Sequence, residues 1–133
     1  MPILQDVTHT LSEAGILVTL DRFSTGQSTL TLLHDMEASY VKIAADRFDP
    51  EDARGRIITN DMINLANSLG YKVICEGVTS QKQVDDLMMC GCNLYQSFFY
   101  DKPLSERFFV NRLQNPSYEN EVSIPASSEE PVT

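Results

Sequence analysis

Four polar side chains of this 133-residue sequence could together carry out chemistry on a phosphodiester: Asp21, Lys42, Glu76 and Gln96. Two carboxylates can hold hard divalent cations, a lysine can orient or deprotonate a water molecule, and an amide can bind a base or a phosphate. Each of the four falls at or near the carboxyl end of a predicted strand. Parallel barrels gather their functional side chains at that end, so the recurrence favours an ancestral site.

Each of these residues also has a purely structural interpretation, which is favoured for any one of them taken alone. Asp21 can start a turn, and Lys42 can lay its aliphatic stem along the sheet while its ammonium group stays in water. Glu76 can form a solvated corner, and Gln96 can satisfy a backbone amide. Only the joint pattern shifts the balance towards a site.

The elements that must position these residues alternate along the chain. Apolar runs predict strands at 16–20, 40–44, 71–75 and 93–96, each followed by a helix, and a further helix opens the chain. Glycines 15, 70 and 91 are expected to end helices, and Ser80 with Gln83 matches a capping box. The apolar helix positions are Leu4, Val7, Leu11 and Ala14, then Leu30, Leu33 and Met36, then Ile58, Met62, Leu65 and Leu69, then Val84, Leu87 and Met88, and last Leu104, Phe108 and Phe109.

Repeated strand–helix units require a parallel sheet with right-handed crossovers. The predicted fold class is therefore α/β: half of a TIM-type (β/α)8 barrel, with about four parallel βα units preceded by a helix. A complete barrel needs eight such units and about 250 residues. Residues 1–113 should form this truncated domain, and residues 114–133, dominated by Pro, Ser and Glu, a disordered acidic tail. Four strands leave two open edges and one bare face, so we expect pairing with another chain.

Composition narrows the class of protein further. A net charge of −9 disfavours binding to nucleic acid and to anionic lipid surfaces. The sequence offers no signal peptide and no apolar window of about 20 residues, so we expect a cytoplasmic protein without membrane contact. Three cysteines, an odd number, fit reduced structural thiols better than metal ligands, because Cys90 and Cys92 have no second ligand pair nearby.

Four blocks of the sequence resemble, in order, motifs of the EAL-domain cyclic di-GMP phosphodiesterase family. Residues 20–30, LDRFSTGQSTL, are similar to L-D-D-F-G-T-G-x-S-S-L, and residues 41–43, VKI, resemble its K-I-D strand. Residues 73–79, VICEGVT, are similar to V-I-A-E-G-V-E. Residues 91–97, GCNLYQS, with KPL at 102–104, match G-C-D-x-x-Q-G…K-P-L. The blocks span residues 16–104, and their shared order makes the resemblance specific.

The resemblance implies a role for each of the four polar residues. Asp21 matches a metal-binding aspartate, and Lys42 matches the lysine that contacts the attacking water. Glu76 matches a glutamate of the catalytic centre, and Gln96 a glutamine near metal-bound water and substrate. The resemblance also implies dimerisation near the segment 23–30.

The departures from the family pattern point to lost catalysis. Arg22 replaces a second metal-binding aspartate, and Ala44 replaces the carboxylate of K-I-D. Thr79, Ser24 and Ser97 replace a motif glutamate and two motif glycines. The family's E-A-L strand, and the asparagine and glutamate ligands after it, would lie before residue 1. Without those oxygen donors a divalent ion would keep mostly water ligands and bind weakly.

We therefore expect a degenerate, catalytically inactive EAL-like domain that acts in regulation or protein interaction in bacterial cyclic di-GMP signalling. The alternatives are a fragment of an active cyclic di-GMP phosphodiesterase and a sensor that binds this nucleotide without cleaving it. No cofactor is expected for the isolated chain, and Mg²⁺ or Mn²⁺ only if a complete site forms. The expected partner is a second copy or another protein chain that covers the open half-barrel, and binding of cyclic di-GMP should be weak.

Overall fold

The computed structural model describes residues 2–23, 30–45 and 51–115. Its elements are α1 (Pro2–Glu13), β1 (Thr19–Leu20), α2 (Leu30–Asp35), β2 (Tyr40–Ala44), α3 (Ala53–Ser68), β3 (Lys72–Glu76), α4 (Gln81–Met89), β4 (Leu94–Gln96) and α5 (Glu106–Gln114). This order confirms the predicted opening helix and four strand–helix units. The segment at 24–29 and almost all of the expected tail lie outside the described residues.

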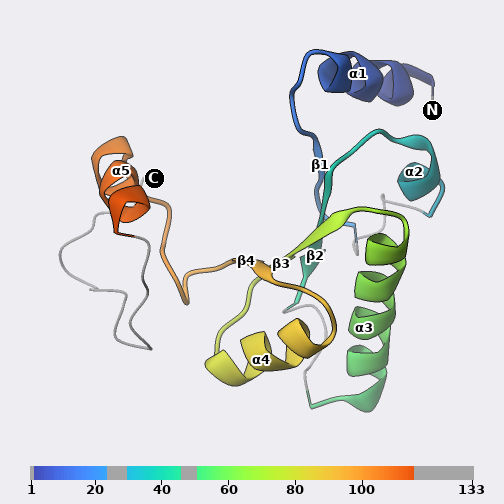
Figure 1. Ribbon diagram of the computed structural model, residues 1–133. Coiled ribbons are helices and arrows are strands. Elements are labelled where there is room, and N and C mark those ends of the chain that lie inside the picture. The colour runs from blue at the N-terminus through green and yellow to red at the C-terminus, as the bar shows by residue number, and fades with distance from the viewer. Residues whose placement is uncertain (1, 24–29, 46–50, 116–133) are drawn as a thin grey trace.

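The strands form one parallel four-stranded sheet in the order β1-β2-β3-β4 (Figure 1). Leu20 pairs with Val41 at the short first strand, and β2 pairs with β3 along its whole length. Because consecutive strands are always neighbours, the sheet is an open segment of a barrel. The predicted α/β partial barrel is confirmed.

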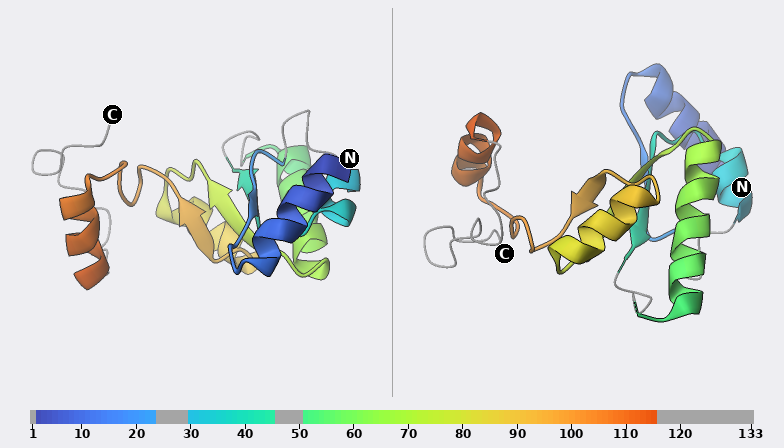
Figure 2. Two further views of the ribbon diagram at one scale, coloured as in Figure 1. Left: turned by 90° about the horizontal axis from the view of Figure 1, so that it is seen from above. Right: turned by 60° about the horizontal axis from the view of Figure 1, so that its bottom comes forward.

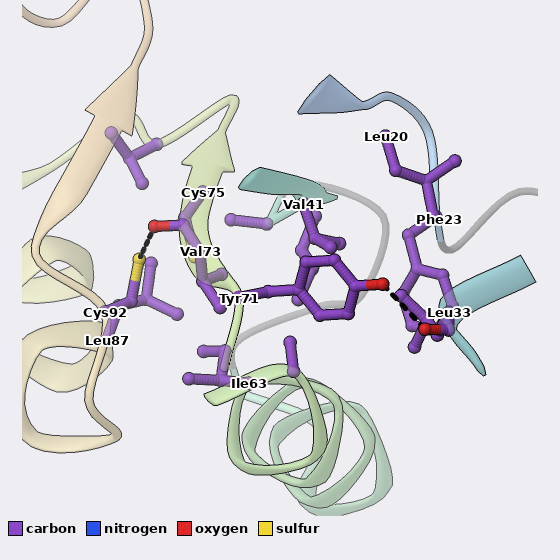
Figure 3. Close-up of a cluster of buried hydrophobic side chains, with 14 of the residues drawn as sticks. Leu20, Phe23, Leu33, Val41, Ile63, Tyr71, Val73, Cys75, Leu87 and Cys92 are labelled. Carbon is purple, nitrogen blue, oxygen red and sulfur yellow. Dashed lines mark hydrogen bonds between the residues drawn. The ribbon is translucent and has the colours of Figure 1, made fainter. Parts of the chain in front are cut away.

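One face of this sheet is buried beneath helices. Val41 and Ile43 of β2 alternate with exposed or half-exposed neighbours, as do Val73 and Cys75 of β3, so their side chains share one face. They pack against side chains of α2, α3 and α4, among them Leu33, Ile63 and Leu87 (Figure 3). The alternate residues of the same strands therefore face the other, uncovered side.

The hydroxyl of Tyr71 ties α2 to the sheet. Its single hydrogen lies between the carbonyl oxygens of Leu33, at 2.6 Å (Figure 3), and Met36, at 3.0 Å. The ring is buried just before β3 begins. One side chain thus satisfies carbonyls at the carboxyl end of a helix more than thirty residues earlier.

Local capping chemistry sets the start of α4. The hydroxyl of Ser80 accepts a hydrogen bond from the amide of Gln83 at 3.2 Å, as the capping box predicts. The Gln83 side chain then accepts from the amide of Thr79, at 3.0 Å, one residue earlier than in the standard box. Gly91 ends the turn after this helix with a φ of 98°.

The apolar stripe predicted for α3 was wrong by one position. The buried residues are Gly55, Thr59, Ile63 and Ala66, whereas Ile58, Leu65 and Leu69 are exposed. Met62, the fourth predicted residue, is half-buried and packs against the core. Three of the four buried side chains are small or absent, which lets the helix lie close to the sheet. The prediction chose the large apolar residues of the helix, whereas the side that faces the sheet carries mostly small residues.

The two terminal helices leave several of their predicted inward residues exposed, although Leu11 is half-buried. In α1 the buried residue is Thr8, while Leu4 and Val7 are exposed. No residue of α5 is buried, although Phe108 is half-buried. Helix α1 precedes β1 and helix α5 follows β4, the two outer strands of the described sheet. Among the described residues, no helix is long and apolar enough to cross a membrane.

An ion pair holds α5, which stands apart from the sheet in all views (Figures 1 and 2). Arg112 places Nη2 at 2.9 Å from Oδ1 of Asp101 and Nε at 2.8 Å from Oδ2. Both side chains are largely shielded from water. This two-point contact fixes both the distance and the orientation of α5 relative to the loop after β4.

Replacing Tyr71 by phenylalanine should lower the free energy of unfolding by about 1 to 2 kcal/mol, because the buried carbonyls of Leu33 and Met36 lose their donor. Urea denaturation followed by circular dichroism measures this change. Tyr40→Phe is the matched control, since Tyr40 is only half-buried and its hydroxyl has no hydrogen bond within the described ranges. Equal stability of the two variants would contradict the assignment.

Replacing Arg112 by alanine should release α5 while leaving the sheet intact, because the hydrogen bond from Nη2 and the ion pair with Asp101 disappear. Hydrogen exchange of the amides of α5 should become at least several-fold faster, and exchange in β2 and β3 should not change. Arg107→Ala, an exposed position on the same helix, should leave both unchanged. Unaltered α5 exchange in Arg112→Ala would show that other contacts hold the helix.

Candidate functional site

Strand register brings the predicted site residues onto one face of the sheet. Glu76, the last residue of β3, pairs with Gln96 on one side and Ala44 on the other. Lys42 lies two residues before Ala44 and therefore points to the same side. Asp21 follows Leu20, the register partner of Val41, so it continues the same alternation beside Lys42. This common side is the uncovered face.

Lys42 is not at the end of its strand. It lies in the middle of β2 and pairs with Ile74, one layer below Glu76. The strand-end position beside Glu76 belongs to Ala44, whose methyl group offers no ligand oxygen. Glu76 and Gln96 are therefore the predicted residues that lie directly next to each other.

Asp21 lies in a constrained corner after β1. Its Oδ1 accepts a hydrogen bond from the backbone amide of Arg22 at 2.8 Å. Arg22 has a φ of 55°, a left-handed conformation that few residues other than glycine adopt. The buried Phe23 follows, and its amide donates to the carbonyl of Lys42 at 3.2 Å. One carboxylate oxygen of Asp21 is thus already hydrogen-bonded, and the next residue, Arg22, carries a positive charge.

The described residues do not fit a divalent metal ion by themselves. Within ranges 2–23, 30–45 and 51–115, no three His, Cys, Asp or Glu side chains gather closely enough to share one ion. Asp21 follows β1 and Glu76 ends β3, so β2 lies between their strands, and neighbouring strands lie about 4.8 Å apart. Mg²⁺ and Mn²⁺ require a nearly complete octahedral shell, so further oxygen donors would have to come from elsewhere.

A cleft of about 920 Å³ opens beside Glu76 and Gln96. Its walls include apolar side chains from the loop after β4 and from α5, and polar groups lie among them. Neither Asp21 nor Lys42 lines it. Its lining residues are Glu76, Gly77, Val78, Thr79, Gln96, Ser97, Phe98, Phe99, Asp101, Lys102, Pro103, Leu104, Phe109 and Arg112.

Sequence reasoning missed most of this cleft. The aromatic run Phe98-Phe99-Tyr100, placed directly after a strand end, was the available signal. Phe99 and Tyr100 pack edge to face with ring centroids 5.1 Å apart. Nothing in the sequence indicated that Asp101 would pair with Arg112 eleven residues later.

Cys75 and Cys92 belong to the core. Both are buried, and the thiol of Cys92 donates to the carbonyl of Val73 at 3.5 Å (Figure 3). The hydrogen bond to Cys92, together with burial, raises the pKa of the Cys75 thiol. Burial also raises the pKa of Cys90. The thiols of Cys75 and Cys90 are therefore held in the neutral form, which is a poor nucleophile and a poor metal ligand. The hydrogen bond with Cys75 instead lowers the pKa of the Cys92 thiol to about 7.

The sequence is similar to proteins named as cyclic di-GMP phosphodiesterases. A probable cyclic di-GMP phosphodiesterase of Escherichia coli K12, PdeG, is 33% identical over 100 residues, covering 71% of this chain and 19% of that protein. The bifunctional diguanylate cyclase/cyclic di-GMP phosphodiesterase MucR of Pseudomonas aeruginosa is 30% identical over 100 residues, covering 74% and 15%. The chain therefore spans less than a fifth of the length of these relatives.

The fold is also similar to solved structures of EAL domain proteins. The EAL domain of Mycobacterium smegmatis DcpA superposes with a TM-score of 0.77 at 26% identity, over 84% of this chain and 51% of that chain. An EAL domain protein of Listeria monocytogenes gives a TM-score of 0.76 at 25% identity, over 84% and 46%. The model of the EAL domain family matches residues 3–103, most of the chain. The chain belongs to the EAL domain family.

Proposed function

We propose that this chain is a degenerate EAL-like domain that acts in regulation or protein interaction in cyclic di-GMP signalling and does not hydrolyse the nucleotide on its own. Its relatives include proteins named as cyclic di-GMP phosphodiesterases, which supports the signalling context. The observation that carries the proposal is the identity of two positions at the strand ends. Arg22 and Ala44 stand where the family resemblance implies acids. A cytoplasmic location stays a prediction.

Arg22 changes the electrostatics of the corner after β1. Its guanidinium is permanently positive, so it repels a divalent cation instead of binding it. The neighbouring carboxylate of Asp21 already accepts the Arg22 amide. Together these features weaken the first position at which a metal ion would have to bind.

Ala44, the last residue of β2, has no side-chain oxygen that could bind a metal ion. It pairs with Glu76, so a carboxylate at this position would lie next to the Glu76 carboxylate. Two adjacent carboxylates could share a cation, whereas a methyl group leaves Glu76 with only the amide of Gln96 as a polar register neighbour. This face of the sheet therefore carries polar side chains but too few carboxylates to bind a pair of metal ions.

A second candidate function is half of an active phosphodiesterase, completed by another polypeptide. The retention of Asp21, Lys42, Glu76 and Gln96 along one face favours it. In that case Asp21 and Glu76 would be two of several ligands of Mg²⁺ or Mn²⁺, and Lys42 would hold a water molecule. The missing ligands would come from the completing polypeptide.

The purified chain incubated with cyclic di-GMP and Mn²⁺ should release no linear dinucleotide above the protein-free blank. Chromatographic separation of the nucleotides measures this. Product that disappears in Lys42→Ala, but persists in Lys72→Ala as a control on the same face, would contradict the proposal. The second candidate would then be favoured.

Restoring the two acids with Arg22→Asp and Ala44→Asp should tighten Mn²⁺ binding by about tenfold or more, because the change adds two hard anionic ligands and removes a cation. Electron paramagnetic resonance of free Mn²⁺ measures the affinity. The matched control is Ala53→Asp with Arg54→Asp, which makes the same changes at exposed positions of α3. Equal affinity of the two double variants would show that these positions do not limit metal binding.

A further inference from the structure

Two of the three cysteines lie against each other on the covered side of the sheet. Cys75, in β3, is 0% exposed, and Cys92, in the turn before β4, is 1% exposed. Their thiols share a hydrogen bond, and the Cys92 sulfur also lies 3.5 Å from the carbonyl oxygen of Val73 (Figure 3). Cys75 points away from the face that carries its neighbour Glu76, so the candidate site uses neither thiol.

The turn that carries Cys92 is fastened on two sides. The side-chain amide of Asn67, in α3, donates to the carbonyl oxygen of Gly91 at 3.1 Å. The hydroxyl of Tyr95, in β4, donates to the carbonyl oxygen of Cys92. The backbone on both sides of Cys92 is therefore held in place, which keeps its thiol next to that of Cys75.

The two thiols differ in charge near neutral pH. The hydrogen bond from Cys75 lowers the pKa of the Cys92 thiol to about 7, although burial acts in the opposite direction. The same hydrogen bond, together with burial, raises the pKa of the Cys75 thiol. Near pH 7 much of Cys92 is therefore thiolate, the form that attacks electrophiles, while Cys75 keeps its proton.

The other titratable groups around the pair do not compete with Cys92 for this role. They are Cys90 in the same turn, Tyr95 of β4, and Asp85 and Asp86 of α4. Burial and the charge of Asp86 raise the pKa of Cys90, so this more exposed thiol stays neutral. Burial and the charge on either thiol of the pair raise the pKa of Tyr95, which also stays neutral.

We propose that Cys75 and Cys92 are an oxidation site, at which a hydroperoxide converts the two buried thiols into a reversible disulfide. The bond would join β3, one residue before Glu76, to the turn that leads into β4. The two sulfurs must approach from hydrogen-bond distance to about 2.05 Å, which draws this turn towards β3. This inference does not depend on the proposed function.

The reaction needs one molecule of hydrogen peroxide and proceeds in two steps. The Cys92 sulfur attacks one peroxide oxygen, the O–O bond breaks, and the departing hydroxide takes up the proton that Cys92 had released, which leaves a sulfenic acid. The Cys75 sulfur then attacks the Cys92 sulfur, and the Cys75 proton leaves with the displaced hydroxyl group as water. Two thiols lose two electrons, and one peroxide becomes two water molecules.

Exposure and charge favour different cysteines, and this contrast separates the site from ordinary surface oxidation. Cys90 is the more accessible thiol and should react first with a bulky maleimide. Hydrogen peroxide is small and uncharged, and it reaches Cys92 when the turn opens locally. Peroxide requires a thiolate, so it should select Cys92 although that residue is buried.

The reduced chain, treated at pH 7 with about a tenfold excess of hydrogen peroxide, should lose two hydrogen atoms within one chain. Cleavage with trypsin after Lys82 places Cys75 on a different peptide from Cys90 and Cys92. Mass spectrometry should find these two peptides joined through Cys92 and separated again by dithiothreitol. The rate of oxidation should be half-maximal near pH 7, where Cys92 ionises.

Three variants assign the roles of the cysteines. Cys90→Ser should form the bond at a rate within about twofold of the unmodified chain, and Cys92→Ala should not form it. Cys75→Ala should give a sulfenic acid that dimedone traps, and its rate profile should move about one pH unit higher, because the hydrogen-bond donor is lost. Circular dichroism checks that each variant folds. The peptide map and pH profile of the unmodified chain need no variant.

The inference is overturned if peroxide oxidises Cys90 faster than Cys92, or if the disulfide joins two chains. It also fails if Cys92 stops at the sulfenic acid in the unmodified chain while Cys75 remains a thiol. A rate that becomes half-maximal only above about pH 8.5, as for an ordinary thiol, contradicts it as well. No nucleotide or metal ion enters these measurements, so their outcome is separate from the test of cyclic di-GMP turnover.

Discussion

The parallel pairing of β2 with β3 is the constraint on which the rest of this structure depends. Once Ala44 lies opposite Glu76, the period of two residues places Val41, Ile43, Val73 and Cys75 on the buried face. The same register places Lys42 and Glu76 on the other face. A shift by one residue would bury the charged residues and expose the core, so burial and site geometry are fixed together.

The incomplete barrel explains where the apolar surface remains. Helix α3 connects β2 with β3, and α4 connects β3 with β4; both helices bury residues of their inward faces. Helices α1 and α5 lie beyond the outer strands, and their apolar side chains stay exposed for that reason. The Asp101–Arg112 pair keeps α5 in position even though little packs against it.

The face that would carry catalysis retains its polar residues but has a different charge pattern. Asp21 is held by the amide of Arg22, and the position beside Glu76 carries a methyl group. Electrostatic stabilisation of a metal ion depends on several anionic oxygens converging on one point. The retained residues alone line one side of such a point, and this is the physical basis of the proposed role in regulation or protein interaction.

The sequence by itself determined the family, the order of elements, the parallel sheet, and the recurrence of Asp21, Lys42, Glu76 and Gln96 on successive predicted strands. These features follow from local periodicity and from motif order, both of which can be read along the chain. Only the tertiary structure decided which side of α3 is buried, that Lys42 lies one layer below the strand ends, and that Arg112 meets Asp101 at the cleft. Those outcomes depend on how closely a helix approaches the sheet and on contacts between distant segments, which no local pattern encodes.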